Sequence, residues 1–188
     1  MKGALIVLGV VVVVALILGG SLMGSRNELV AEREAINGQW AQVDSAMQRR
    51  LDLIPNLVET VKGAATHEEK VIGEVTEARA AMMGAKTPQQ KIDANNQLSG
   101  ALGRLMVVVE NYPNIKANEN FLSLQNELAG TENRINVERR KYNEAVQRYN
   151  TDIALFPKNI AAGMFGFSRE DAYFKADTAA KEAPKVKF

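Results

Sequence analysis

The sequence predicts an all-α protein with an N-terminal transmembrane helix, an elongated antiparallel four-helix bundle and an aromatic C-terminal tail. Residues 3–25 carry no charged side chain. Downstream, apolar residues recur at intervals of three and four, which is the spacing of one face of a helix. The sequence lacks strand signals: apolar and polar residues do not alternate over a sustained run, and no hairpin turn lies between apolar runs. We therefore expect an anchor at 1–25, a bundle at 26–157 and a tail at 158–188.

The uncharged run lies between Lys2 and Arg26. A bilayer core of about 30 Å needs roughly 20 apolar helical residues to cross it. A cleaved signal peptide is the alternative, with an apolar core at 4–18 and the small residues Gly19, Gly20 and Ser21 behind it. The run is long for a signal, which favours a retained anchor. A lipid-modified cysteine is excluded, because the chain has no cysteine.

The side of the membrane follows from the charges that flank this run. The N-terminal amine and Lys2 face Arg26 and Arg33 across the span, which is close to a tie under the positive-inside rule. The positive charges on the short N-terminal tail slightly favour a cytoplasmic N-terminus with the domain outside. The bacterial inner membrane is the location that the resemblance below implies.

The remaining composition limits the kinds of partner and chemistry. About 160 residues follow the anchor, enough for one domain with its own core. The chain has 23 Lys and Arg against 22 Asp and Glu, so no basic surface for nucleic acid is indicated. The absence of cysteine excludes disulfides and thiolate-bound metals.

Four apolar stripes predict the helices, and their boundaries carry start and stop signals. The stripes occupy residues 29–61, 71–82, 98–112 and 121–153. The signals are a capping box from Thr66 to Glu69, a second from Thr87 to Gln90 with Pro88 at the first helical position, a stop at Tyr112-Pro113, a cap at Asn118 and a stop at Phe156-Pro157. The short connections favour antiparallel neighbours.

Proline and glycine modify this pattern at two places. Pro55 lies inside the first stripe and removes a backbone hydrogen bond, but the apolar phase continues across it, so we expect a kink and not a chain reversal. No proline separates the anchor from this stripe, and the two can form one rod. In the tail, we expect Gly163 and Gly166 to interrupt any regular helix.

The sequence does not indicate an enzyme. His67, the only histidine, is expected at a solvent-facing helix start. With one histidine and no cysteine, only carboxylates are left as metal ligands. Glu68 and Glu69 are adjacent and lack the spacing that lets two side chains share a helix face, so we predict no metal site and no cofactor. Trp40, Tyr142 and Tyr149 lie on apolar stripes and are expected in the core. Two asparagine series, 126/133 and 136/143/150, repeat at seven-residue intervals, as on a solvated face, and a regular amide face could also meet a neighbouring copy.

The run Arg49-Arg50-Leu51-Asp52-Leu53-Ile54-Pro55-Asn56-Leu57-Val58-Glu59-Thr60-Val61-Lys62-Gly63 strongly resembles the LemA family of bacterial membrane proteins. Further matching motifs are Trp40-Ala41-Gln42-Val43-Asp44, His67-Glu68, Glu77-Ala78-Arg79, Tyr142-Asn143, Tyr149-Asn150, Phe156-Pro157, Phe165-Gly166-Phe167, Tyr173-Phe174 and Pro184-Lys185-Val186-Lys187-Phe188. One departure is Ala64, where an aromatic residue is expected. The resemblance implies an N-terminal span, a helical bundle and no agreed enzymatic activity. Magnetosome proteins of the MamQ type look like relatives, which implies a role in shaping membranes.

Several residues are candidates for contacts with other molecules. Arg49, Arg50 and Asp52 beside Pro55 could present a guanidinium fork to a carboxylate or phosphate, whereas Arg50 could instead pair inside the bundle with Glu132 or Glu138. In the tail, the aromatic candidates are Phe165, Phe167, Tyr173 and Phe174. We expect at least part of this group to pack between chains. Gly20 and Gly24 have the spacing that lets membrane spans pack closely.

Three functions are compatible with these features. We favour a binding or scaffolding module held at the lipid bilayer by one span. The first alternative is a homo-oligomer that organises or shapes the membrane. The second is an accessory subunit of a membrane protease or another membrane enzyme. Nucleic acid is not an expected partner.

Overall fold

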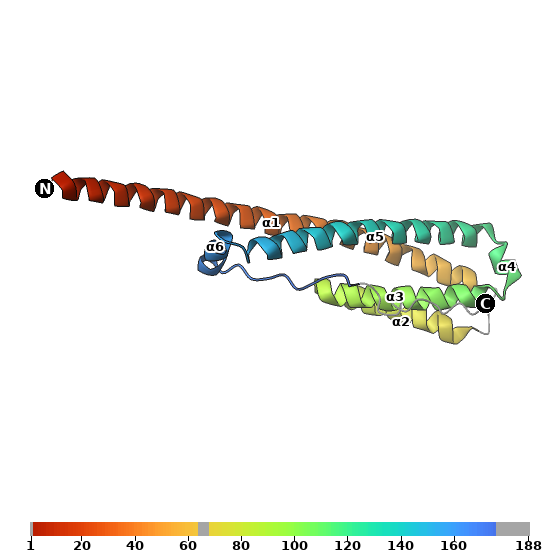
Figure 1. Ribbon diagram of the computed structural model, residues 1–188. Coiled ribbons are helices and arrows are strands. Elements are labelled where there is room, and N and C mark those ends of the chain that lie inside the picture. Colours follow the sequence, from red (N-terminus) through yellow and green to blue (C-terminus); the bar gives the residue numbers. More distant parts are fainter. Residues whose placement is uncertain (1, 64–67, 176–188) are drawn as a thin grey trace, which may run out of the picture. The chain divides into compact units, whose positions relative to one another are not determined.

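The computed structural model describes residues 2–63 and 68–175 (Figure 1). Within these residues the chain is helical and has no strand, which confirms the all-α class. The described helices are α1 (Lys2–Lys62), α2 (Glu69–Gly84), α3 (Pro88–Val109), α4 (Pro113–Lys116), α5 (Glu119–Asp152) and α6 (Lys158–Phe165).

The four apolar stripes correspond to α1, α2, α3 and α5. Helix α1 is one uninterrupted helix of 61 residues that contains both the uncharged run and the first stripe, as expected. It also passes through Pro55 without a chain reversal. The expectation that the chain does not reverse at Pro55 is therefore confirmed.

Local caps explain where two of the helices begin. The Thr87 hydroxyl accepts from the Gln90 backbone N–H and the Gln90 side chain accepts from the Thr87 backbone N–H, each at 3.2 Å, which is the predicted capping box. Asn118 Oδ1 accepts from the backbone N–H groups of Asn120 and Phe121 at 2.9 and 3.2 Å. The predicted cap at Thr66 lies outside the described residues.

Two short helices were not predicted. Pro113 begins α4, whereas α3 has already ended at Val109. The expectation that Gly163 interrupts helical structure in the tail was wrong, because Gly163 lies inside α6. Gly166 does end α6: its φ of 74° is the left-handed conformation, and its N–H donates to the Ala162 carbonyl.

The chain forms two compact units, and α1 and α5 contribute to both. One unit contains Met1–Gln42 and Arg140–Asp171. In it, the first part of α1 runs antiparallel to the last part of α5, and α6 packs beside them (Figure 1). Its buried apolar side chains are Leu29, Ile36, Tyr142, Val146, Tyr149, Ala161 and Ala162.

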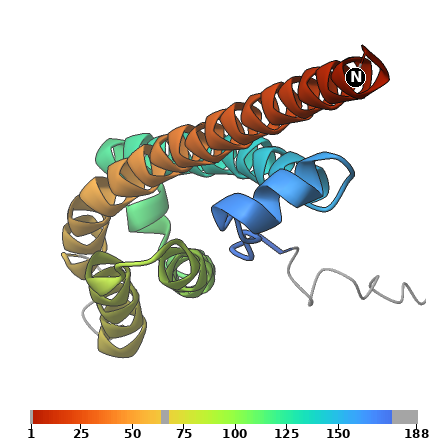
Figure 2. The same ribbon diagram turned by 90° about the vertical axis from the view of Figure 1, so that its left-hand side faces the viewer.

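The other unit contains Val43–Arg139 and Ala172–Phe188. Helices α2 and α3 form an antiparallel pair, side by side in Figures 1 and 2. Their buried faces, together with those of α1 and α5 in this unit, make the core. Its fully buried large side chains include Met47, Ile54, Leu57, Leu98, Leu105, Ile115, Phe121 and Ile135.

The aromatic core residues are partly as expected. Tyr142 and Tyr149 are buried, with exposed fractions of 1% and 2%. Trp40 is only half-buried, so its expected place in the core is confirmed only in part. Its ring meets Tyr142 edge to face, with centroids 5.3 Å apart and an interplanar angle of 61°.

Candidate functional site

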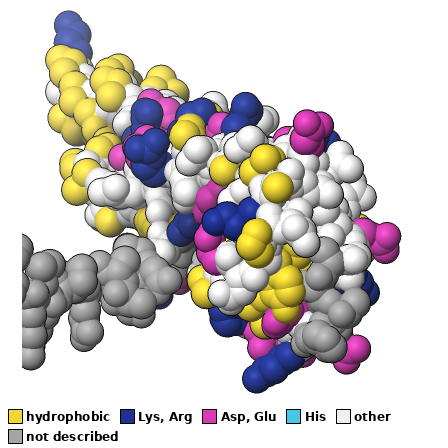
Figure 3. Space-filling view, turned by 90° about the vertical axis from the view of Figure 1, so that its right-hand side faces the viewer, with side chains coloured by type: hydrophobic (Ala, Val, Ile, Leu, Met, Phe, Trp, Pro, Cys, Tyr) yellow, Lys and Arg dark blue, Asp and Glu magenta, His cyan; other side chains and the backbone are white. Residues whose placement is uncertain are grey.

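The uncharged part of α1 exposes a continuous run of apolar side chains. Its large side chains, Leu5 to Leu18, are 48–70% exposed. Figure 3 shows hydrophobic side chains along this projecting part of the helix, with basic atoms at its tip. A soluble protein rarely exposes such a surface, and a helix of this length and composition can cross a bilayer. Gly20 and Gly24 lie on it, with no other side chain near their Cα atoms.

Arg50, one of the three residues proposed for a guanidinium fork, points into the bundle. Only 5% of the residue is exposed. Its Nη1 donates to Asn95 Oδ1 at 3.1 Å and to Ser99 Oγ at 2.9 Å, and lies 2.9 Å from Glu132 Oε2. Burial lowers the pKa of Arg50, and the Glu132 carboxylate opposes that shift. Arg50 therefore joins α1 to α3 and α5, and Glu132 is one of the two partners expected for it.

Arg49 and Asp52 remain on the surface and make local contacts. Arg49 Nη2 donates to Glu127 Oε2 at 2.7 Å, and both side chains are about half exposed. Asp52 Oδ1 accepts from Gln48 Nε2 at 2.9 Å, one turn earlier in α1. The three candidates do not form one fork, because Arg50 faces inward and the other two face solvent.

Pro55 lies at an open groove between α1 and α5. The groove has a volume of about 650 Å³ and is lined by Pro55, Asn56, Glu59, Thr60, Asn120, Ser123 and Leu124. Its wall is mostly amide, hydroxyl and carboxylate groups. One of them is already used, since the Thr60 hydroxyl donates to the Asn56 carbonyl at 2.8 Å. The groove is therefore better suited to a polar segment of another protein than to an apolar ligand.

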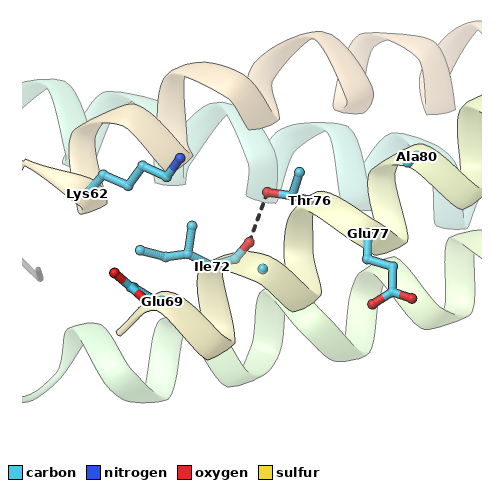
Figure 4. Close-up of a pocket in the computed structure, with 7 residues that line it drawn as sticks. Lys62, Glu69, Ile72, Thr76, Glu77 and Ala80 are labelled. Carbon is cyan, nitrogen blue, oxygen red and sulfur yellow. Dashed lines mark hydrogen bonds between the residues drawn. The ribbon is translucent and has the colours of Figure 1, made fainter. Parts of the chain in front are cut away.

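A second hollow lies along α2, at the end of α1 (Figure 4). Its volume is about 790 Å³, and Lys62, Glu69, Ile72, Gly73, Thr76, Glu77 and Ala80 line it. The Thr76 hydroxyl donates to the Ile72 carbonyl at 2.9 Å and is thus engaged. No group of three potential metal ligands occurs among the described residues. His67 lies outside the described residues.

The segment after α6 is attached to the end of α5 by hydrogen bonds between α5 side chains and its backbone. The Tyr149 hydroxyl donates to the Ser168 carbonyl at 2.9 Å. The Asn150 side chain donates to the Glu170 carbonyl at 2.7 Å and accepts from the Glu170 N–H at 2.9 Å. Asn150 is 4% exposed, so the expected solvated asparagine face is wrong at this position.

The four tail aromatics belong to different units. Phe165 and Phe167 are in the first unit, where Phe165 is 38% exposed and Phe167 is half-buried. Tyr173 and Phe174 are in the second. Phe174 is 6% exposed, and the Arg139 guanidinium lies 4.7 Å from its ring centroid. Phe174 therefore packs within its own chain and needs no second copy to cover it.

A cluster of charges joins α1, α5 and α6 next to the end of the uncharged run. Lys158 pairs with Asp152, lies 3.0 Å from Glu28 and 3.5 Å from Glu32, and Arg148 lies 3.7 Å from Glu32. Burial and a hydrogen bond with Asp152 raise the pKa of Glu32. Hydrogen bonds from Lys158 and Glu32 lower the pKa of Asp152. Of these two carboxyl groups, Glu32 is therefore the one that holds a proton to higher pH.

The sequence did not single out this cluster or Arg139, and it placed Asn150 on a solvated face. Each depends on a partner far away in the chain, and no local spacing marks it.

Comparison with known proteins places these features in a family. Residues 39–188 match the family model described as LemA family. The magnetosome protein MamQ 2 of Paramagnetospirillum magneticum is 28% identical over 94% of this chain and 73% of its own length, and MamQ 1 of the same organism matches equally. Protein LemA of Metamycoplasma hominis is 23% identical over 87% of this chain and 73% of its own length.

Proposed function

The chain belongs to the LemA family, and we propose that it is a non-enzymatic, single-pass protein of the bacterial inner membrane that acts as a binding or scaffolding module. One observation supports this most directly. A single helix, α1, is apolar and exposed up to Gly24 and then supplies buried side chains from Leu29 onward. The anchor and the bundle are thus parts of one continuous element. We propose the segments 1–25, 26–157 and 158–188 as anchor, bundle and tail.

The anchor is tested by extraction. The chain should stay with membranes after a carbonate or high-salt wash. Salt and base weaken electrostatic contacts, but they do not offset the favourable free energy of placing an apolar run of this length in lipid. Release of the intact chain by carbonate would refute the anchor. Mass spectrometry of a mature N-terminus near Ser21 would show a cleaved signal instead.

The orientation is tested by protease protection. With a cytoplasmic N-terminus, trypsin added to spheroplasts should cut the bundle, which has basic residues exposed at Arg49 and Arg104. Protection in spheroplasts, with cutting only after lysis, would place the bundle in the cytoplasm.

For the binding surface, we propose the polar groove beside Pro55. It combines open space with exposed hydrogen-bonding groups on two helices. Ser123→Trp should fill the groove and abolish capture of a membrane-protein partner by cross-linking in cells. Gln125→Trp, at an exposed position two residues along α5, is the matched control. Equal capture by both variants would exclude the groove.

The homo-oligomer that shapes membranes is the second candidate, and Gly20 and Gly24 on an exposed apolar helix favour it. The particle mass in mild detergent separates the two, since a scaffold that binds another protein needs no second copy. A mass of several chains that falls to one in Gly20→Leu would support self-assembly. An accessory role would appear as stable co-purification with a membrane enzyme such as a protease.

A further inference from the structure

Helix α6 and the residues before it expose an apolar surface that the anchor and the bundle do not use. Leu155 is 57% exposed, Phe156 79%, Ile160 46% and Met164 65%. Ile160 and Met164 are four residues apart and therefore share one face of α6. Ala161 and Ala162 are buried on another face, where their small side chains let α6 pack closely against its own unit. The helix is thus apolar on the side that faces solvent as well as on the side that it buries.

The ends of α6 are fixed beside the turn of α1 where the uncharged run stops. At one end, Lys158 lies 3.0 Å from Glu28 and 3.5 Å from Glu32. At the other, the Arg26 guanidinium lies 5.6 Å from the ring centroid of Phe165. Arg26 is the first charged residue after the run. The whole arrangement lies within one compact unit. Consequently α6 lies where a bilayer crossed by α1 would end.

We propose that α6 and the preceding residues Leu155 and Phe156 lie in the interfacial layer of the bilayer as a second, peripheral membrane contact. This inference rests on the proposed membrane anchor. Amphipathic helices bind this layer with their apolar face about 5–10 Å below the headgroup boundary. The acidic groups of the adjacent turn do not oppose it, because Glu28, Glu32 and Asp152 pair with Lys158 or Arg148. A lipid surface fits better than a second copy, since the apolar surface of α6 lies beside the end of the apolar run of α1 in the same chain.

The chain has no cysteine, so single cysteines can be labelled without altering any other residue. The labelled variants are Met164→Cys on α6, Phe156→Cys before it, Val12→Cys in the span and Ala41→Cys as the control. All four positions are exposed. Ala41 is fifteen residues beyond Arg26 in the same helix, which is about 22 Å further along its axis. The full chain carries an environment-sensitive fluorophore at each cysteine in vesicles of phosphatidylcholine and phosphatidylglycerol.

Two quenchers report where each label lies: nitroxide lipids labelled near the headgroup or near the chain end, and iodide in the water. The labels at 156 and 164 should be quenched several-fold more by the headgroup-proximal nitroxide than the label at 41, and should be shielded from iodide. The label at 12 should respond most to the chain-end nitroxide.

Each other outcome is decisive. If both quenchers affect the labels at 156 and 164 as much as the label at 41, the inference is overturned. The anchor is then still supported if the chain-end nitroxide quenches the label at 12. The labels at 156 and 164 could instead be shielded from both iodide and lipid nitroxides. If dilution of the protein into excess lipid removes that shielding, a second copy covers α6, and the inference is also overturned. A label at 12 that no lipid nitroxide quenches would refute the anchor itself.

Discussion

Arg79 donates a hydrogen bond to the Leu51 carbonyl, which Pro55 leaves without its helical partner. The distance from Arg79 Nε to the Leu51 oxygen is 3.1 Å. In a regular helix the residue four positions on would supply the N–H, but proline has none. A side chain from α2 thus supplies the donor that Pro55 lacks. This explains how α1 continues through Pro55 while Leu51, Leu53 and Ile54 stay buried around it.

A double-mutant cycle tests this relationship. Arg79→Ala should lower the free energy of unfolding by about 1–3 kcal/mol, because it leaves a part-buried carbonyl without a donor. In a Pro55→Ala background the backbone N–H returns, and the same substitution should cost clearly less. Chemical denaturation of the four proteins in mild detergent measures the coupling. Equal costs in both backgrounds would mean that Arg79 stabilises the unit in another way.

Arg50 makes the second prediction. Arg50→Met keeps most of the side-chain volume but leaves the Glu132 carboxylate and the buried Asn95 amide without their cation, so we expect a loss of about 3–5 kcal/mol. Adding Glu132→Gln should recover part of the loss, because the uncompensated charge is removed. Arg49→Met at the exposed neighbouring position should cost less than about 1 kcal/mol. Similar losses for Arg49→Met and Arg50→Met would contradict the buried role of Arg50.

The third prediction concerns pH. Folding raises the pKa of Glu32, so the stability that this group contributes is complete below its ordinary pKa of about 4.5 and is lost as the pH rises through the folded value. Folding lowers the pKa of Asp152, which stays ionised across that window. Glu32→Gln does not titrate, and its amide can still donate to Asp152. Its melting temperature relative to the native chain should therefore rise between about pH 4 and about pH 8.

The control for this measurement is Glu34→Gln, at an exposed position two residues further along the same helix. Its melting temperature should keep a constant difference from the native chain over the same range. If Glu32→Gln behaves in the same way as Glu34→Gln, the protonation of Glu32 plays no part in stability.

The helices and their caps could be predicted because their signals are local. The Thr87 to Gln90 box and the Asn118 cap each need only residues three positions apart. The partners of Arg50 could be anticipated only as a choice between Glu132 and Glu138, and Asn95 and Ser99 not at all. These partners lie 45 to 82 residues away, on helices whose rotation no local spacing determines.

The asparagine series shows why a regular spacing can predict the wrong environment. Asn136 is exposed, Asn143 is half-buried and Asn150 is buried, although they are spaced by seven residues. Seven residues are slightly less than two turns of an α-helix, so such a series drifts by about 20° per step around the axis. The drift turns the last member away from solvent, and the backbone of Glu170 then closes over it.

Asn150 makes the last prediction, which tests whether the tail is held by its own chain. Asn150→Ala removes the two hydrogen bonds between its side chain and the Glu170 backbone. The loss of about 1–2 kcal/mol should raise the population of the detached segment roughly tenfold. Limited trypsin digestion after the exposed Arg169 should accelerate by a similar factor. Asn133→Ala, the same change at an exposed position of α5, should leave the rate unchanged. An Asn150→Ala rate equal to that of the native chain would show that other contacts hold the segment.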